Sequence, residues 1–341
     1  MRRAAAVILV FMLGTSPAWA CGGLVAPNGS VNLLRTSTLA GYHNGIEHYI
    51  TSFEFVGGGA KFGSIVPLPD RPKFVSRGGD WTLQRLAQEV QPPPPTFEGG
   101  PVPAPASAPA KEVLEKRIDG LLITILKGGA RGVGRWAKEE GFKLPPDAPR
   151  VLNFYSKRSR WFMAARFIPE KARKTKLRQG DAIPIHLRIP TDDPWVPLRI
   201  LALGKQQEEL VEADVFLLTE REPALLPEPA PAGERGMSLE RSEQASQQLL
   251  NDLDSDKGMK WIPEESGMWL TYLRLDIDAA DLTYDLAVDQ TGNGQPSPAD
   301  AFGKGATTSR DPERTMWAWL ALPLIGAGGV RLVGRRLMPR R

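Results

Sequence analysis

A proline-rich stretch divides this chain of 341 residues and limits what it can fold into. Residues 91–110 contain eight prolines, interspersed with alanine, glycine and serine. Proline has no backbone N–H and a fixed φ, so such a stretch supports neither a helix nor a central strand. We therefore predict an extended linker or a long surface loop between residues 21–90 and residues 111–300.

The segment before this stretch alternates short apolar or β-branched runs with glycine-containing breaks near residues 41–45 and 57–59. The pattern predicts a β-meander over residues 31–69, followed by a short amphipathic helix at 81–90. A segment of this size buries only a small core, and no disulfide compensates for it. We expect residues 21–90 to pack with the rest of the chain in one body.

Beyond the linker, the sequence predicts an α+β fold that is mainly antiparallel β-sheet with a few helices. Runs with helical spacing predict helices at 132–140, 146–156 and 238–253, the last after a second proline-rich break at 222–231. Runs rich in β-branched and aromatic residues predict strands at 118–126, 161–168, 183–189, 196–202, 211–218 and 269–277.

The N-terminus has the three-part layout of a secretory signal. Arg2 and Arg3 precede an unbroken apolar stretch at residues 4–13, and Ala18-Trp19-Ala20 is a small-x-small cleavage pattern. An apolar core of about ten residues is too short to cross a hydrocarbon layer roughly 30 Å thick. We predict that residues 1–20 are a signal peptide that is removed during export.

The mature chain would then begin at Cys21, the single cysteine of the sequence. One cysteine excludes an intramolecular disulfide and a cysteine-built metal site, so stability must come from a packed core. Three states of Cys21 stay open: a free thiol, an intermolecular disulfide, or the acylated cysteine of a lipoprotein. A lipoprotein signal favours a leucine-like residue where this chain has Ala18, so we expect a free amine at Cys21.

The C-terminus has the features of a membrane anchor. Residues 316–330 carry no charge, and the run extends to residue 334 if Arg331 reaches to the interface. At 1.5 Å per helical residue this segment measures about 28 Å, enough to span a bilayer. Arginines without acids follow it, so we predict a transmembrane helix at 316–334 and a cytoplasmic tail at 335–341. The alternatives are a buried core helix or a sorting tail that is later removed.

This topology predicts a single-pass protein of the bacterial cell membrane whose main domain is periplasmic or extracellular. The net charge of +4 does not indicate a nucleic-acid partner, because basic residues concentrate at the two ends. Without the two arginines of the signal and the five from Arg331 to the C-terminus, 36 bases face 39 acids. The expected partners are the cytoplasmic membrane and an envelope protein or glycan, and no nucleic acid.

Several motifs occur in an order that resembles one known family. They are Cys21-Gly22-Gly23, Ile65–Pro69, Trp136–Phe142, Trp161–Arg166, Ile185–Pro190 and Trp195–Ile200. Over roughly residues 21–290 the chain resembles the exported, membrane-anchored bacterial family called domain of unknown function 2330. It departs from that family in having Gly63-Ser64 before the Val-Pro-x-Pro segment and no second cysteine. The resemblance implies location and fold, and it supplies no catalytic residue.

One loop resembles a calcium-binding loop. Oxygen ligands alternate from Asp289 through Thr291 and Asn293, glycine follows where the chain must turn sharply, and Asp300 stands at the twelfth place. Threonine at the third place and aspartate at the twelfth depart from the usual pattern. We predict these four residues as candidate calcium ligands, with an Asx-rich surface turn as the alternative.

Three other patterns have ordinary structural alternatives that we favour. The histidines, at 43, 48 and 186, lack metal-ligand spacing, and we expect polar surface residues at 43 and 48. Residues 128–134 are glycine-rich before a helix but lack a Gly-Lys-Ser/Thr ending, which favours a flexible turn. Asp252, Asp254 and Asp256 form a second, less complete calcium pattern, with Lys257 where glycine is needed.

No reaction is specified by the sequence. It contains no Gly-x-Ser-x-Gly elbow and no carboxylate pair singled out by spacing, so we predict no catalytic or cofactor-binding residue. We interpret the chain as a non-enzymatic binding or structural protein of the envelope. The alternative is an exported hydrolase, which a cleft with His48 or His186 beside a carboxylate and a serine would favour.

For the tryptophans at 136, 161, 195 and 269 we expect positions in the hydrophobic core. A patch of exposed aromatic side chains would instead favour a binding function.

Overall fold

The computed structural model describes residues 23–25, 35–54, 62–90, 115–168, 182–192, 194–263, 267–291 and 294–303. The predicted signal peptide, the linker at 91–110 and the predicted transmembrane helix lie outside these residues. Among the helices that are described, none has the length and apolar character needed to cross a membrane.

A tight hairpin lies in the largest sheet. Strands β2 (Arg35–His43) and β3 (Ile46–Glu54) are joined by a two-residue turn. Asn44 and Gly45 both have positive φ, 51° and 70°, the backbone of the turn that matches the twist of paired strands. The strands on both sides of this hairpin, β9 (Ala182–Pro190) and β11 (Leu210–Thr219), come from beyond the linker.

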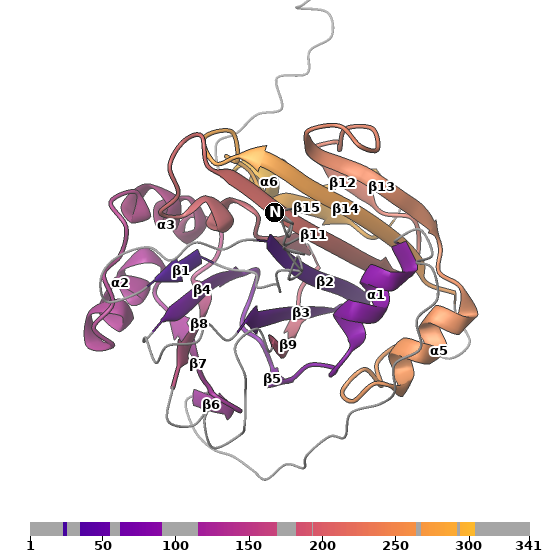
Figure 1. Cartoon of the computed structure of the whole chain (residues 1–341), viewed down its shortest axis with the longest axis horizontal. Coiled ribbons are helices and arrows are strands. Elements are labelled where there is room, and N and C mark those ends of the chain that lie inside the picture. Colours follow the sequence, from indigo (N-terminus) through magenta and orange to yellow (C-terminus); the bar gives the residue numbers. More distant parts are fainter. Residues whose placement is uncertain are drawn as a thin grey trace, which may run out of the picture. The chain divides into compact units, whose positions relative to one another are not determined.

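The described strands form three sheets, and Figure 1 labels most of these strands. The seven-stranded sheet has the order β13 (Gly236–Gln244), β14 (Trp269–Asp278), β11, β2, β3, β9 and β5 (Phe74–Arg77). The five-stranded sheet has the order β1 (Gly23–Val25), β4 (Gly63–Leu68), β8 (Trp161–Phe167), β7 (Leu121–Lys127) and β6 (Glu115–Ile118). A small sheet has the order β10 (Trp195–Val196), β15 (Leu286–Asp289) and β12 (Ala224–Leu226). All pairs of the described strands are antiparallel except β2 with β11, which is parallel.

The seven-stranded sheet is buried on both faces, because alternate residues of its strands enter two different cores. On one face, Leu39, Ile50 and Phe216 pack with helices α1 (Thr82–Val90) and α5 (Gln247–Ser255). On the other face, residues such as Tyr49 and Leu217 join the core that includes the five-stranded sheet. Figure 1 shows α1 beside α5, while α2 (Gly129–Glu139) and α3 (Ala148–Ser156) lie by the five-stranded sheet.

The α+β class, rich in antiparallel strands, is confirmed, as are the helices near 81–90, 132–140 and 146–156. The prediction of a β-meander over residues 31–69 is wrong, because β4 pairs with β8 in the five-stranded sheet rather than with β3. The prediction of a strand at 196–202 is also wrong, since a 3-10 helix occupies Arg199–Ala202. The break at 222–231 contains β12, and a short helix α6 (Pro298–Phe302) follows β15.

The predicted helix at 238–253 is a strand in its first half. Residues 236–244 pair with β14 as edge strand β13, and only Gln247–Ser255 is helical. Glutamate, arginine and glutamine favour a helix locally, but backbone pairing with β14 outweighs that preference. Helix α5 begins after Ser246, whose hydroxyl accepts a hydrogen bond of 3.1 Å from the Leu249 N–H.

Candidate functional site

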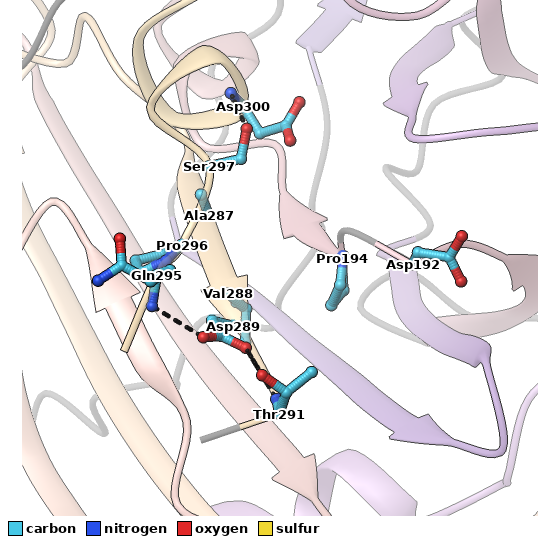
Figure 2. A pocket seen from close by; sticks show the side chains of 10 residues that line it. All are labelled: Asp192, Pro194, Ala287, Val288, Asp289, Thr291, Gln295, Pro296, Ser297 and Asp300. Atoms are coloured by element: carbon cyan, nitrogen blue, oxygen red, sulfur yellow. Dashed lines mark hydrogen bonds between the residues drawn. The ribbon is translucent and has the colours of Figure 1, made fainter. Parts of the chain in front are cut away.

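A cavity of about 220 Å³ lies between the β9–β10 connection and the segment running from β15 to α6. We call it the acidic cleft. Three aspartates from separate segments line it: Asp192 in the connection, Asp289 at the end of β15 and Asp300 in α6 (Figure 2). The rest of its wall consists of Pro194, Ala287, Val288, Thr291, Gln295, Pro296 and Ser297.

The carboxylate of Asp289 organises the loop at one side of the cleft. One of its oxygens accepts hydrogen bonds from the Thr291 N–H at 2.8 Å and the Thr291 hydroxyl at 2.6 Å. The other oxygen accepts from the Gln295 N–H at 2.8 Å (Figure 2). Burial alone would raise the pKa of Asp289, but these bonds outweigh it and lower the pKa below its ordinary value. Asp289 is therefore a stable carboxylate facing the cleft.

Of the four predicted calcium ligands, Asp289, Thr291 and Asp300 line the same cavity, while Asn293 lies outside the described residues. The bonds between Asp289 and Thr291 are those of an Asx turn, the alternative considered from the sequence. Among the described residues, no three His, Cys, Asp or Glu side chains form a group that could hold a metal ion. A bound calcium would thus take part of its coordination from water or from main-chain oxygens.

A second, smaller cavity of about 10 Å³ adjoins the acidic cleft, and Pro194 and Val288 line both. We call it the Glu47 cavity. Glu47 of β3 lines it and is fully buried, and neither carboxylate oxygen has a hydrogen-bond partner in the part of the chain that the structure describes. Burial raises the pKa of Glu47 to about 8.

Two of the three histidines, His48 and His186, contact each other in the interior. His48 is buried, contrary to the surface position expected for it, and its Nδ1 lies 3.0 Å from Nε2 of His186. Its ring also stacks on Trp261 with centroids 4.0 Å apart. Burial lowers the pKa of His48 to about 2 and that of His186 to about 4, so both rings are neutral near pH 7. Neither histidine lines either cavity described above.

His43, in contrast, lies at the end of β2 near the surface, and its Nδ1 is 2.7 Å from a carboxylate oxygen of Glu220.

The glycine-rich segment at 128–134, for which the sequence favours a flexible turn, is mostly helical. Gly128 stands at the N-cap with φ 125°, and α2 begins at Gly129. Trp136 and Trp195 are buried as expected, whereas Trp161 and Trp269 are only partly buried. The most exposed large apolar residues, Phe74, Trp81, Leu210 and Phe302, are scattered along the chain.

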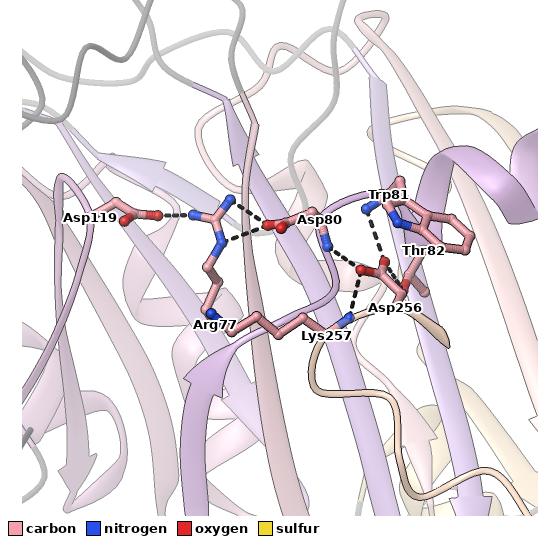
Figure 3. Close-up of polar contacts among 7 residues, drawn as sticks. All are labelled: Arg77, Asp80, Trp81, Thr82, Asp119, Asp256 and Lys257. Atoms are coloured by element: carbon pink, nitrogen blue, oxygen red, sulfur yellow. Dashed lines mark hydrogen bonds and ion pairs between the residues drawn. The ribbon is translucent and has the colours of Figure 1, made fainter. Parts of the chain in front are cut away.

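The three aspartates at 252, 254 and 256 do not converge. Asp256 is buried, and its carboxylate accepts hydrogen bonds from the N–H groups of Asp80 and Trp81 and from the Thr82 hydroxyl (Figure 3). It thereby caps the start of α1 from the loop after α5. Asp252 pairs with Arg85, and Asp254 with Lys260. Each of the three carboxylates thus has a different structural partner, in line with the structural alternative that the sequence favours.

Two residues of these cavities, Asp192 and Glu47, were not predicted from the sequence. Asp192 lies in a connection with no local motif, and only the fold brings it to Asp289. Glu47 lies in an alternating strand, on the same face as the buried Tyr49. Recognising that both faces of β3 are covered would have identified Glu47 as a buried acid.

A family match supports the resemblance inferred from the order of the motifs. The model of a family described as uncharacterized protein conserved in bacteria (DUF2330) matches residues 15–221. The chain belongs to this family. The match includes Glu47 and Asp192 and ends before Asp289 and Asp300. The resemblance inferred from the sequence is thus confirmed.

No curated protein matches the chain. Among solved structures, a mutated baculovirus P35 after caspase cleavage is similar with a TM-score of 0.40 and 6% identity, covering 76% of this chain and 99% of that one. Baculovirus P35 itself gives a TM-score of 0.38 at 7% identity, covering 74% of this chain and 96% of that one. TM-scores this low carry no functional implication.

Proposed function

We propose that this protein is a membrane-tethered component of the bacterial envelope whose β-rich domain, outside the cytoplasmic membrane, acts by binding a partner at the acidic cleft. The observation that carries this proposal is that Asp192, Asp289 and Asp300, from three separate segments, line one cavity of about 220 Å³. The signal-like N-terminus and the apolar, arginine-ended C-terminus support the location.

The chemistry of the cleft favours a positively charged ligand. Its polar lining consists of carboxylate, hydroxyl and amide groups, and Asp289 is held in its ionised form by hydrogen bonds. Several carboxylates in a concave site raise the local concentration of cations. Calcium prefers oxygen ligands, and we retain it as the ligand to test first. A basic group of an envelope protein or an amino sugar would meet the same lining.

Binding is favoured over the alternative of an exported hydrolase by the placement of the histidines. A histidine base needs a position from which it can reach a substrate and a pKa near the working pH. His48 and His186 contact each other in the interior, and burial lowers both pKa values well below neutral.

Titration calorimetry of the full-length chain with calcium chloride, and with magnesium chloride for comparison, tests the proposal. We expect calcium binding in the wild type and about tenfold weaker binding in Asp192→Asn, which is about 1.4 kcal/mol. Asp192→Asn leaves the hydrogen bonds of the Asp289 loop in place, so it tests charge rather than loop folding. Asp281→Asn, an exposed carboxylate that does not line the cleft, is the matched control. Absence of heat, or equal affinity in all three proteins, would contradict a calcium-binding cleft.

A further inference from the structure

Positive charge gathers on the outer side of helices α2 and α3 and the loops that flank them. Residues 127–160 expose eight lysines and arginines to solvent but only one acid, Glu139. The two other acids of this segment are engaged within the fold, since Glu140 pairs with Arg166 at 2.8 Å and the Asp147 carboxylate accepts a backbone N–H. Outside the signal-like N-terminus and the C-terminal arginines the chain carries 36 bases against 39 acids, so this surface is a local excess of positive charge. We call the exposed bases of residues 127–160 the basic face.

The spacing of these bases places them in stripes along both helices. In α2, Arg131, Arg135 and Lys138 follow one another at intervals of four and three residues, which puts them on one side of the helix. In α3, Arg150 and the C-cap residue Lys157 are seven residues apart, close to two full turns. The buried residues of each helix occupy its other side. The stripes are therefore surfaces that the core of the domain does not use.

The two stripes belong to one surface because α2 and α3 pack against each other. A Cβ placed on Gly129, the first residue of α2, would lie 2.8 Å from the Cβ of Ser156, the last residue of α3. The Gly128 N–H donates to the Arg160 carbonyl at 3.0 Å, which fixes the start of α2 to the loop after α3. Figure 1 shows the two helices side by side, at the opposite side of the view from α5.

A tryptophan lies at the margin of the basic face. Trp161 is partly exposed, and its ring centroid lies 5.3 Å from Nζ of Lys127 and 5.7 Å from the guanidinium carbon of Arg71. An amphipathic ring among cations is typical of a surface that rests at a membrane–water interface. This ring favours a partner that combines anionic headgroups with an apolar layer.

The described chain ends beside the basic face. Gly303 follows α6, and a Cβ placed on it would lie 3.1 Å from the ring of Phe154 in α3. The Arg158 guanidinium donates to the carbonyl oxygen of Asp300, which joins α6 to the end of α3. Twelve residues lie between Gly303 and the proposed transmembrane segment at 316–334, a length of at most about 43 Å. Such a tether keeps α3 within reach of a bilayer surface.

We propose that the basic face binds the anionic phospholipid headgroups of the membrane to which the chain is tethered. The proposal rests on the proposed location outside the cytoplasmic membrane and is independent of the ligand of the acidic cleft. Each base held near an anionic bilayer surface strengthens binding by about fivefold, so the bases of one face act together. The tether raises the effective concentration of lipid at the face, so weak individual contacts are sufficient. Binding turns α2 and α3 toward the bilayer.

Lysine acetylation of the full-length chain in lipid nanodiscs tests this contact. The chain is reconstituted in phosphatidylcholine discs and in discs that also contain phosphatidylglycerol, and mass spectrometry measures the acetylation rate of each lysine. We expect Lys138 and Lys157 to react about fivefold more slowly in the anionic discs, because lipid phosphates pair with their ammonium groups. Lys257, which is exposed in the loop after α5, should react equally in both.

A pair of double variants tests whether charge on the helices causes the protection. Arg131→Gln combined with Arg135→Gln removes two exposed charges of the α2 stripe, so Lys157 should regain most of its reactivity in the anionic discs. The matched control is Arg221→Gln combined with Arg235→Gln, which removes two exposed arginines outside the basic face and should leave the protection of Lys157 intact. Equal effects of the two double variants would contradict a role of the basic face.

Retention of the chain in the discs separates this proposal from the proposed anchor. Retention in both kinds of disc with equal lysine reactivity would overturn lipid binding by the basic face and leave the anchor in place. Retention in the anionic discs alone would support the basic face and contradict the anchor, and retention in neither would contradict both. Protection by soluble polyphosphate in phosphatidylcholine discs, with none from phosphatidylglycerol, would assign the basic face to another polyanion and likewise overturn the proposal.

Discussion

Tyr155 donates a hydrogen bond of 2.9 Å from its hydroxyl to the carboxylate of Asp285, and both side chains are completely buried. The same carboxylate accepts from the Leu198 and Arg199 N–H groups, each at 2.8 Å, and forms an ion pair with the buried Arg158. This cluster joins α3 to the segment between β10 and the 3-10 helix and to the chain before β15. It stabilises the wall on which the acidic cleft is built.

Removal of the Tyr155 hydroxyl should therefore destabilise the protein. We expect Tyr155→Phe to lower the free energy of unfolding by about 1 kcal/mol, because Asp285 keeps its other partners. Asp285→Ala should lower it by about 3–5 kcal/mol, since Arg158 would stay buried without its counter-ion. Tyr284→Phe serves as the control, because no hydrogen-bond partner of that hydroxyl occurs among the described residues. Urea unfolding measures these differences, and equal effects of the two tyrosine substitutions would contradict the role of Tyr155.

The buried histidine pair predicts acid sensitivity. Histidine has a pKa near 6.5 when unfolded, whereas burial lowers it to about 4 for His186 and to about 2 for His48. The unfolded state therefore binds more protons below pH 6.5, and stability is lost as the pH falls from 6.5 through 4. Each histidine contributes up to about 1.4 kcal/mol per pH unit in this range.

This acid slope should be smaller in His186→Gln than in the wild type. Urea midpoints at pH 4.5, 5.5, 6.5 and 7.5 measure it. An identical slope in wild type and His186→Gln would show that the pair does not titrate on unfolding.

Glu47 predicts a slope of the opposite sign on the alkaline side. Its pKa rises from 4.5 to about 8 on folding, so its contribution is fully present below pH 4.5 and is lost as the pH rises through 8. Glu47→Gln cannot ionise and should remove this component. A wild-type stability between pH 6 and 8.5 that falls no more steeply than that of Glu47→Gln would contradict a neutral, buried Glu47.

The sequence predicts local elements well and sheet membership poorly. The Asn44-Gly45 turn and the alternation around it are sufficient to predict the β2–β3 hairpin. Nothing local distinguishes β4, which belongs to another sheet, or β13, whose composition favours a helix. These assignments depend on pairing between residues more than 20 positions apart.

The candidate site was predictable to a similar degree. The spacing of Asp289, Thr291 and Asp300 identified one wall of the acidic cleft, because ligands within a loop leave a pattern in the sequence. Asp192 and Glu47 reach the two cavities through the fold, so no spacing rule could have identified them.

The proline-rich residues 91–110 predict where the chain can be cut without losing its fold. Nine residue pairs join β3 to β9, and seven join β2 to β11, so the segment before the linker shares a sheet with the segment after it. We expect limited proteolysis within the linker to leave two fragments that stay associated in gel filtration and unfold together. Separation of the fragments, with residues 21–90 keeping a cooperative melt of their own, would contradict this prediction.

The central claim, a domain outside the membrane held by a C-terminal anchor, is tested most directly by topology reporters. Alkaline phosphatase, which is active only outside the cytoplasm, and green fluorescent protein, which fluoresces in the cytoplasm, are inserted near Ala106 or fused after Arg341 of the full chain. We predict phosphatase activity only at Ala106 and fluorescence only at Arg341, because the proposed signal peptide would export residues 21–315 and the terminal arginines would stay inside. Fluorescence from the reporter at Ala106, without phosphatase activity there, would contradict the account.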